Sequence, residues 1–351
     1  MGAGSRIDPR MQDDYTSVAL HNVAELADPD WTESGDALRR VPTDVAANLN
    51  VSARERVRHP SGSEIRFVPD GDATVRVTLS AAGATVVRPF WGSFQGEEIL
   101  EIGPEPTTVE LSPPDALADL DRDAPAATGA ADAFDPRVCR LRFEPWAPVA
   151  LHRIEGSCRP PEPEELPDHR YLAYGTSITE GAAASATHLN YVSRVARDLG
   201  LDAVNLGVSG AAYCEPAIAD HIAERDDWDV ATLSLSVNMA NRGFTVAQFR
   251  DRAANLVASV AEADPDRPVV CVTLFPYHAD LQHEGDRERA RAYREALEGV
   301  VTDCSAENVH VVDGSELVPA TGLTTDLLHP GDAGMEAIAD GVGAELRDVL
   351  D

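Results

Sequence analysis

The pattern of apolar residues changes near the middle of the chain, and this change constrains the fold more than any other feature. Between about residues 63 and 154, apolar and polar residues tend to alternate in short runs such as EIRFV (64–68) and TVRVTLS (74–80). Glycine and proline separate these runs. Alternation with a period of two, interrupted by turn residues, is typical of antiparallel strands. The first half is therefore predicted to be an all-β sandwich of the jelly-roll type.

The second half shows a different pattern, in which apolar runs of strand length alternate with helical segments. The five runs are YLAYG, DAVNLGV, VATLSLSV, PVVCVTLF and NVHVV. In the helix that follows the third run, one face carries Phe249, Ala253, Leu256, Val257 and Val260. Nearly continuous apolar strands joined by helices give a parallel sheet that is covered on both faces. We therefore predict a three-layer α/β/α domain, flavodoxin-like, with a five-stranded parallel sheet.

These patterns divide the chain into an N-terminal β-domain (1–160), a Pro- and Glu-rich linker (161–169) and the α/β domain (170–351). Within the first domain the extreme N-terminus is expected to be disordered. Residues 43–57 (TDVAANLNVSARERV) are predicted to form a short helix opened by Thr43 or Asp44. The Ala- and Asp-rich stretch 117–137 is predicted to be a solvated loop.

The charge of the chain is strongly acidic. It has 60 Asp and Glu residues against 29 basic residues, which gives a formal net charge of -31, and every basic residue is Arg. Such a balance argues against nucleic acids and anionic membranes as partners, because the chain has too few basic residues to neutralise their many negatively charged groups. In molar salt the Debye length falls to about 3 Å, which screens the self-repulsion of an acidic surface. The composition therefore indicates a halophilic protein; the alternative is an acidic protein from an ordinary cytoplasm.

The cysteines and the N-terminus indicate a cytoplasmic protein. The five cysteines (139, 158, 214, 271 and 304) are odd in number and form no CxxC pair, which favours reduced, buried thiols over disulfides or a zinc site. No secretory signal and no 18-residue apolar run are visible. A homo-oligomer is compatible with this sequence.

The residues that follow the predicted parallel strands are the candidates for chemistry, because ligands bind at the carboxyl ends of such strands. Ser177 follows the first strand, Gly210 the second and Asn238 the third, whereas Asp326 and His329 follow the fifth. All five positions therefore fall on the same edge of the predicted sheet.

This set of residue types suits acyl transfer. A serine hydroxyl needs an adjacent base, and a neutral imidazole oriented by a carboxylate can supply one. Backbone N–H groups and an Asn side chain can stabilise an oxyanion. Taken singly, Ser177 could cap a helix and Asn238 could lie in a turn. The combination favours a hydrolase. The segment HADLQH (278–283) could be read as a metal site, but without a second cluster of ligands we expect a solvated loop and no metal.

The same residues carry a family resemblance. YGTSITEG, NLGVSG, SVN and DLLHP resemble the four sequence blocks of the SGNH/GDSL hydrolase superfamily and follow the same order. The resemblance implies that Ser177 is the nucleophile and that His329 is its base, with Asp326 as the orienting carboxylate. It also implies an oxyanion hole made by Ser177, Gly210 and Asn238, and no cofactor. Two departures are Thr176 and Met239, where the family often has Asp.

The leading β-domain makes the chain similar to a subgroup of GDSL-like acylhydrolases that includes carbohydrate esterases and acyltransferases. We therefore expect a serine esterase acting on a small-molecule ester, for which an acylated carbohydrate is one candidate. An acyltransferase with the same residues is the alternative, and a non-catalytic carbohydrate-binding protein is a third, less favoured because no triad residue is missing. Tyr213 is expected to line the acyl pocket. Phe90 and Trp91 could stack on a sugar, but the sandwich core is the favoured place for them.

Overall fold

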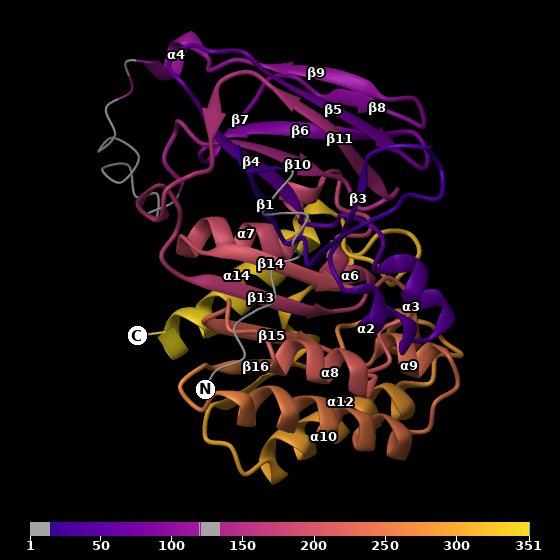
Figure 1. The fold of residues 1–351 in the computed structure, drawn as a ribbon. Helices are drawn as coiled ribbons and strands as arrows, with labels where there is room; N and C mark the ends of the chain where they lie inside the picture. Colours follow the sequence, from indigo (N-terminus) through magenta and orange to yellow (C-terminus); the bar gives the residue numbers. More distant parts are fainter. Residues whose placement is uncertain (1–14, 119, 121–133, 351) are drawn as a thin grey trace.

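The computed structural model describes residues 15–118, 120 and 134–350. The predicted disorder of the extreme N-terminus and most of the predicted loop at 117–137 lie outside the described residues. Figure 1 shows two parts, a β-rich part built from the first half of the chain and a layered α/β part built from the second half.

The first part is a sandwich of two antiparallel sheets, as predicted. One sheet contains, in order, β1 (Ala19–His21), β4 (Glu64–Pro69), β10 (Cys139–Phe143), β6 (Thr85–Trp91) and β7 (Phe94–Gln95), with β12 (Cys158–Arg159) paired to β4 and β8 (Leu100–Ile102) paired to β6. The other contains β2 (Glu25–Ala27), β3 (Asp36–Arg39), β11 (Val149–Glu155), β5 (Val75–Ala81) and β9 (Thr107–Leu111). The strands that the apolar alternation predicted are present.

The core of the sandwich lies between the two sheets. Ile65 and Phe67 of β4 are fully buried in it together with Val77 of β5, as the alternation requires. Phe90 and Trp91 are only 6% and 4% exposed. Trp91 belongs to the sandwich core, as the favoured interpretation required. Phe90 lies outside that core and packs against His188 and Arg142, so the prediction is wrong for Phe90.

Three local predictions for the first half need correction. Strands β1, β2 and β3 precede residue 63, and each is too short to show an alternating pattern. The single helix predicted at 43–57 is two helices, α2 (Thr43–Ala47) and α3 (Val51–Arg56), because the Asn50 side chain accepts a hydrogen bond from the N–H of Ala53 and opens a new helix. The predicted loop at 117–137 is entered by a short helix, α4 (Asp115–Ala118).

The second part is built on the predicted five-stranded parallel sheet. Its strand order is β14 (Asp202–Gly207), β13 (Arg170–Gly175), β15 (Val230–Ser234), β16 (Val269–Val272) and β17 (Val309–Val312). Numbered along the chain this order is 2-1-3-4-5, the flavodoxin-like arrangement. One face is covered by α8 (Pro216–Ala223), α10 (Val246–Ala263) and α12 (Arg287–Asp303), and the other by α7 (Tyr191–Leu199) and α14 (Asp332–Leu350).

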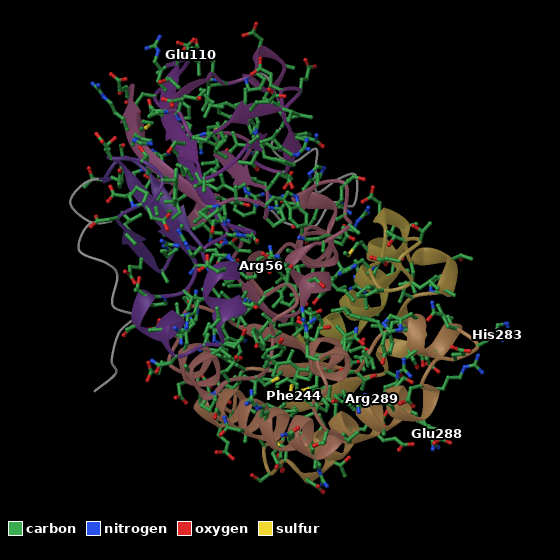
Figure 2. All side chains as sticks on the ribbon, turned by 90° about the vertical axis from the view of Figure 1, so that its right-hand side faces the viewer. Arg56, Glu110, Phe244, His283, Glu288 and Arg289 are labelled. Atoms are coloured by element: carbon green, nitrogen blue, oxygen red, sulfur yellow. The ribbon has the colours of Figure 1, made fainter. Side chains whose placement is uncertain are left out.

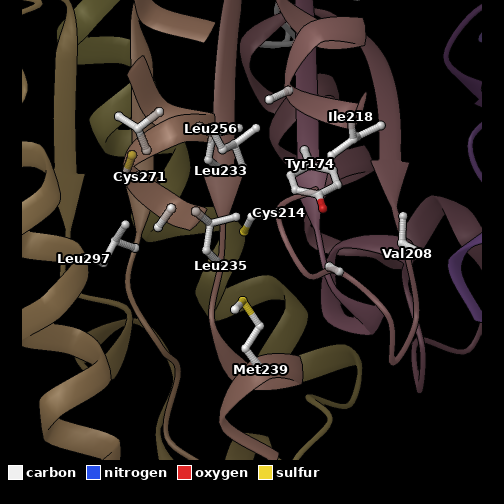
Figure 3. Close-up of a cluster of buried hydrophobic side chains, with 14 of the residues drawn as sticks. Tyr174, Val208, Cys214, Ile218, Leu233, Leu235, Met239, Leu256, Cys271 and Leu297 are labelled. Atoms are coloured by element: carbon white, nitrogen blue, oxygen red, sulfur yellow. The ribbon is translucent and has the colours of Figure 1, made fainter. Parts of the chain in front are cut away.

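Shorter helices occupy the connections. They are α6 (Ser177–Glu180), α9 (Val237–Asn241), α11 (His278–Leu281) and α13 (Gly314–Leu317), with 3-10 turns at η1 (Pro163–Glu165), η2 (Thr187–Leu189) and η3 (Ala320–Gly322). The helix face predicted on α10 is fully buried against the sheet. Figure 3 shows Leu256 of this face in one cluster with Leu233 of β15 and Cys271 of β16. No helix in the described ranges is both long and apolar enough to span a bilayer.

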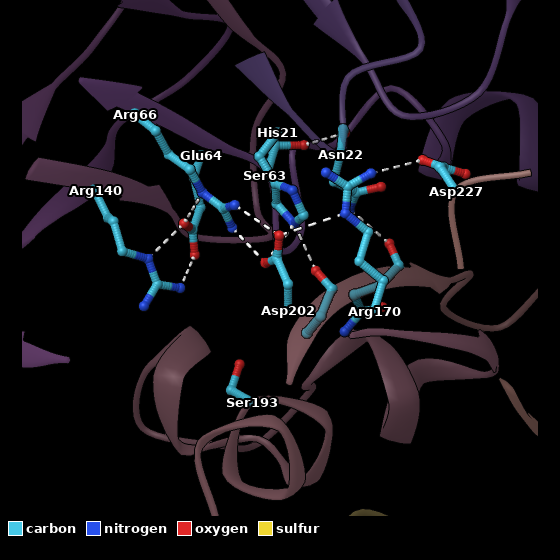
Figure 4. A network of polar contacts seen from close by, with 12 residues as sticks. His21, Asn22, Ser63, Glu64, Arg66, Arg140, Arg170, Ser193, Asp202 and Asp227 are labelled. Atoms are coloured by element: carbon cyan, nitrogen blue, oxygen red, sulfur yellow. Dashed lines mark hydrogen bonds and ion pairs between the residues drawn. The ribbon is translucent and has the colours of Figure 1, made fainter. Parts of the chain in front are cut away.

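An ionic seam joins the two parts. Arg66 of β4 points away from the sandwich core and makes two hydrogen bonds to the carboxylate of Asp202 on β14, at 2.8 and 2.6 Å. Glu64, on the same face of β4, binds Arg66 and Arg140. Figure 4 shows these side chains converging between the two ribbons. The charged face of β4 is therefore covered by the α/β part, and the two parts pack as one body around buried charge.

Candidate active site

The turn between β13 and α6 presents Ser177. The strand ends at Gly175, and Ser177 is the first residue of α6. The cap of this helix is Thr176, whose hydroxyl oxygen accepts a hydrogen bond from the N–H of Ile178. Because Thr176 performs the capping, the hydroxyl of Ser177 is available for another contact. This also gives a role to the threonine that replaces the Asp often found in the family.

The end of β14 packs tightly against α6. A Cβ atom at Gly207 would lie 2.3 Å from the backbone nitrogen of Glu180, so only glycine allows this approach. Asn205, on the same strand, donates from its side chain to the carbonyl oxygen of Thr179. The close fit brings the loop that contains Gly210 to helix α6.

Ser177, His329 and Asp326 form a continuous hydrogen-bonded chain. The Ser177 Oγ lies 2.9 Å from Nε2 of His329, and Nδ1 of His329 lies 2.7 Å from Oδ2 of Asp326. Since a carboxylate only accepts, Nδ1 must carry the proton, which leaves Nε2 free to accept the serine proton. The geometry therefore suits a serine–imidazole–carboxylate triad.

The loop that carries Asp326 and His329 is held in a tight shape. The second carboxylate oxygen of Asp326 accepts the N–H groups of Leu328 and His329, each at 2.9 Å, and the hydroxyl of Thr324 at 2.8 Å. Leu327 has a φ of +53°, a conformation that costs free energy for a residue with a side chain. Desolvation acts to raise the pKa of Asp326, but the hydrogen bonds from His329 and its neighbours outweigh it and hold that pKa well below its ordinary value. Asp326 therefore stays ionised at neutral pH.

Gly210 lies in the loop that follows β14, and Asn238 lies in α9, directly after β15. Gly210 has a φ of +69°, which glycine adopts without strain. Oδ1 of Asn238 accepts the N–H of Ala212 at 3.1 Å, so the side chain is oriented by the Gly210 loop. Ser236, directly before α9, has a φ of +100°. A strained, non-glycine turn of this kind marks functional sites often enough to support the predicted role of Asn238.

Tyr213 and Met239 lie beside Gly210 and Asn238, respectively. The hydroxyl of Tyr213 donates to the carbonyl oxygen of Gly210 at 3.3 Å, and its ring lies 5.1 Å from that of Phe244. Tyr213 thus contacts the Gly210 loop, and its expected place in an acyl pocket stays a prediction. Met239 is fully buried in the apolar cluster beneath the sheet edge, as Figure 3 shows. An Asp at this position would bring an uncompensated charge into the core.

A small cavity of about 10 Å³ is lined by direct sequence neighbours of Ser177 and His329. It lies between Thr176 and Leu328, and its walls also come from the ends of β15 and β16, including Val237, Phe275 and Tyr277. This volume corresponds to roughly one water molecule. The walls are mainly apolar, and the cavity has no room for a long acyl chain.

Sequence reasoning missed Glu180, which lies three residues after Ser177. All four residues of α6 are buried, and Glu180 is only 1% exposed. The available signal was an acidic residue directly before Gly181, inside a segment otherwise made of small and apolar residues. A carboxylate buried this deeply requires compensating partners.

The segment HADLQH shows no ligand arrangement. Asp280 forms a bidentate ion pair with Arg294, at 2.9 and 2.8 Å. Figure 2 shows His283 at the outer surface, far to the side of the α/β part. Among the described residues, no group of three or more His, Cys, Asp or Glu side chains is placed to hold a metal ion.

The chain resembles known proteins in sequence and in fold. Residues 173–337 match the model of the GDSL-like Lipase/Acylhydrolase family. No curated protein matches the sequence. Among solved structures, the salicylyl-acyltransferase SsfX3 from a tetracycline biosynthetic pathway is similar, with a TM-score of 0.73 and 17% identity over 95% of both chains.

Two further structures resemble the whole chain. A family two carbohydrate esterase from Cellvibrio japonicus has a TM-score of 0.66 and 12% identity over 96% of both chains. A putative GDSL-like lipase from Bacteroides ovatus has a TM-score of 0.64 and 17% identity over 95% of this chain and 96% of that one. At such identities the likeness shows the fold, and it extends over both parts of the chain.

Proposed function

Since residues 173–337 form a domain of the GDSL-like lipase/acylhydrolase family, we propose that the chain is a serine esterase that hydrolyses the carboxylic ester of a small molecule. The observation that carries the proposal is the unbroken contact from Ser177 Oγ to His329 Nε2 and from His329 Nδ1 to Asp326, at 2.9 and 2.7 Å. A nucleophile, a base and an orienting group within hydrogen-bond reach are what acyl transfer requires.

In the first half-reaction, Ser177 Oγ attacks the ester carbonyl carbon while its proton moves to Nε2 of His329. Asp326 stabilises the imidazolium that forms. The negative charge on the carbonyl oxygen is received by the backbone N–H groups of Ser177 and Gly210 and by the side-chain amide of Asn238. The intermediate collapses as the ester C–O bond breaks, and the leaving alkoxide takes the proton from His329. This leaves an acyl-enzyme and a free alcohol.

In the second half-reaction, water replaces the alcohol. His329 accepts a proton from the water as the oxygen attacks the acyl carbon, and the same donors stabilise the second oxyanion. Collapse returns the proton to Ser177 and releases the carboxylic acid. Every step uses side chains and backbone groups of this chain.

The substrate class follows from the surroundings of the triad. The apolar cavity beside Thr176 and Leu328 is too small for a long acyl chain, which favours a short acyl group. The alcohol part is proposed to be a carbohydrate or another decorated small molecule, which is the kind of substrate named for the carbohydrate esterase that shares this fold.

Acyl transfer to a second alcohol is the alternative, and one observation favours keeping it. Of the three structures described above, the acyltransferase SsfX3 has the highest TM-score with this chain. The chemistry would be unchanged except that an alcohol would replace water in the second half-reaction. Adding an alcohol acceptor and measuring how the acyl group divides between acid and new ester distinguishes the two.

The experiment is a panel of 4-nitrophenyl esters and acetylated sugars in molar salt. We expect Ser177→Ala to lower kcat by about 10³-fold or more. Ser305→Ala, which removes an exposed hydroxyl in a loop after α12, serves as the matched control and should keep full activity. Turnover that persists in Ser177→Ala would refute the serine mechanism, and no turnover of any ester by the unaltered protein would favour a binding protein.

A further inference from the structure

The carboxylate of Glu180 takes no part in the proposed mechanism, yet it is buried next to the nucleophile. Its Oε1 accepts the hydroxyl of Ser61 at 2.8 Å, from the segment between α3 and β4. Its Oε2 accepts the backbone N–H of Ser209 at 2.8 Å and also the hydroxyl of that residue. One oxygen therefore faces the first half of the chain, and the other faces the loop after β14.

The charge of this carboxylate is balanced from the first half of the chain. The guanidinium of Arg40 is buried and lies 3.7 Å from Oε1. The same guanidinium donates to the carbonyl oxygens of Asn205 and Gly207 at the end of β14. Burial lowers the pKa of Arg40, whereas Glu180 acts to raise it. A buried anion with a cation and three hydrogen-bond donors has a single favourable orientation.

We infer that Glu180 and Ser61 are positioning residues for the oxyanion hole. Ser209 directly precedes Gly210, and the peptide unit between them carries the Gly210 N–H that is the proposed second oxyanion donor. The N–H of Ser209 belongs to the preceding peptide unit, so Glu180 holds the backbone before Ser209 together with its side chain. In this way it fixes the position from which the peptide unit to Gly210 starts. The inference rests on the proposed function, since it names what orients one of its donors.

The inference gives the β-rich part a role in catalysis without substrate contact. Ser61 lies outside the α/β part, but its hydroxyl sets the position of the Glu180 carboxylate, and through it the Ser209 peptide. A purely structural contact would stabilise the fold and leave kcat unchanged. A positioning contact changes kcat, because a displacement of about 1 Å can cost roughly 10²-fold in rate.

Ser61→Ala and Ser63→Ala form a matched pair that separates these cases. Both serines are fully buried in the same segment, and each donates one hydrogen bond of 2.8 Å, Ser61 to Glu180 and Ser63 to the carbonyl oxygen of Asn22. We expect Ser61→Ala to lower kcat for 4-nitrophenyl acetate about 10-fold and to change KM by less than about twofold. The expected loss is smaller than the roughly 10²-fold cost of a 1 Å displacement, because one lost hydrogen bond should displace the donor by less. Ser63→Ala should keep kcat even where its thermal midpoint falls by the same amount. Rates are referred to active sites counted from the nitrophenol burst, which removes the effect of unfolded protein.

Two further variants test the path through Glu180. Glu180→Gln, which keeps the shape but loses the charge, should lower kcat by more than Ser61→Ala does. In the double variant Ser61→Ala/Ser209→Ala the loss of kcat should be smaller than the product of the single losses, because both hydroxyls act on one carboxylate.

A kcat for Ser61→Ala equal to that of Ser63→Ala overturns the inference, as does a loss that appears only in KM. These outcomes are distinct from failure of the proposed function, which Ser177→Ala decides. If Ser177→Ala abolishes turnover while Ser61→Ala does not affect kcat, the esterase stands and the positioning role falls.

Discussion

The carboxamide of Asn238 can stabilise an oxyanion only if its NH2 group faces the substrate. Oδ1 of Asn238 is engaged by the N–H of Ala212, which orients the side chain so that its Nδ2 is the end left for a ligand. The residue is 8% exposed, so a hydrogen bond made here would be only weakly screened by water. We therefore propose that Asn238 is a donor held in place before the charge develops, which is the arrangement that lowers a transition-state barrier.

Replacing Asn238 by Ala should lower kcat by roughly 10²- to 10³-fold, the cost of one oxyanion donor. KM should change little, because the charge appears only in the transition state. Steady-state kinetics with a short-chain nitrophenyl ester measures both constants. Asn241→Ala, an exposed position on the same helix, is the control. A near-normal kcat in Asn238→Ala would show that Asn238 is not an oxyanion donor and has only a structural role in the turn.

The order of residues along the chain predicted much of this arrangement, because parallel strands bring their carboxyl ends to one edge. The positions of Ser177, Asp326 and His329 required no knowledge of loop shape beyond that rule. Glu180 was missed because its partners, Ser61 and Arg40, are more than a hundred residues away and no periodic pattern connects them. Such pairs depend on how the two parts dock.

At the scale of elements, the contact between β1 and β14 links stability to pH. Nε2 of His21 on β1 lies 2.7 Å from the carbonyl oxygen of Ala203 and 3.4 Å from the carboxylate of Asp202. Figure 4 shows His21 enclosed with Arg66 and Asp202. Burial, aided by Arg66, lowers the pKa of His21 to about 4, against the opposing effects of Asp202 and Glu64. The imidazole is therefore neutral in the folded protein.

Acid should weaken the fold through this histidine. Between pH 6.5 and pH 4 the unfolded chain binds a proton that folded His21 does not, so the free energy of unfolding decreases as the pH falls. The full effect is of order 3 kcal/mol, from a pKa difference of about 2.5. His21→Gln keeps a donor and should flatten the dependence of stability on pH, measured by guanidinium unfolding at pH 7, 5.5 and 4. His283→Gln, at an exposed position, should not. Equal slopes in both variants would show that His21 does not carry the effect.

Asp202 contributes in a separate range of pH. Desolvation acts to raise its pKa, but the charge and hydrogen bonds of Arg66 outweigh this, with His21 adding to the effect only once it is protonated, so the folded-state pKa lies well below the usual value. A carboxyl group whose pKa is lowered by folding stabilises the fold at any pH above its pKa in the unfolded chain, which is about 3.9. This stabilisation is lost as the pH falls below that value. The two effects are therefore separable by titration.

The alternation in β4 predicted which side chains enter the sandwich core, but it also implied that the opposite face of the strand is exposed to solvent. That face, with Glu64 and Arg66, is buried against the α/β part. Sequence pattern could not show this, because Arg66 and Asp202 are 136 residues apart and a charged face facing solvent has the same signature. Docking of the two parts overrides the local pattern.

At the scale of the whole molecule, part of the positive charge is inside. Arg40, Arg66 and Arg140 are buried with Glu64, Glu180 and Asp202, whereas acidic residues such as Glu110 project from the surface, as Figure 2 shows. Screening by salt acts on charges in water much more than on buried pairs. High salt should therefore weaken the repulsion among surface carboxylates while leaving the ionic seam intact.

We propose on this basis that the fold requires high salt. The thermal midpoint should rise as KCl increases from about 0.1 M to about 1 M, over which the Debye length falls from roughly 10 to 3 Å. A parallel titration with sucrose, which stabilises by exclusion from the protein surface and does not screen charge, separates the two causes. Glu97→Gln/Glu98→Gln, at two exposed neighbouring positions, should raise the midpoint in dilute buffer and have a smaller effect in molar KCl. A midpoint that is the same in dilute buffer and in molar KCl would contradict the proposal, because unscreened repulsion of a net charge of -31 would then have no measurable effect on the fold.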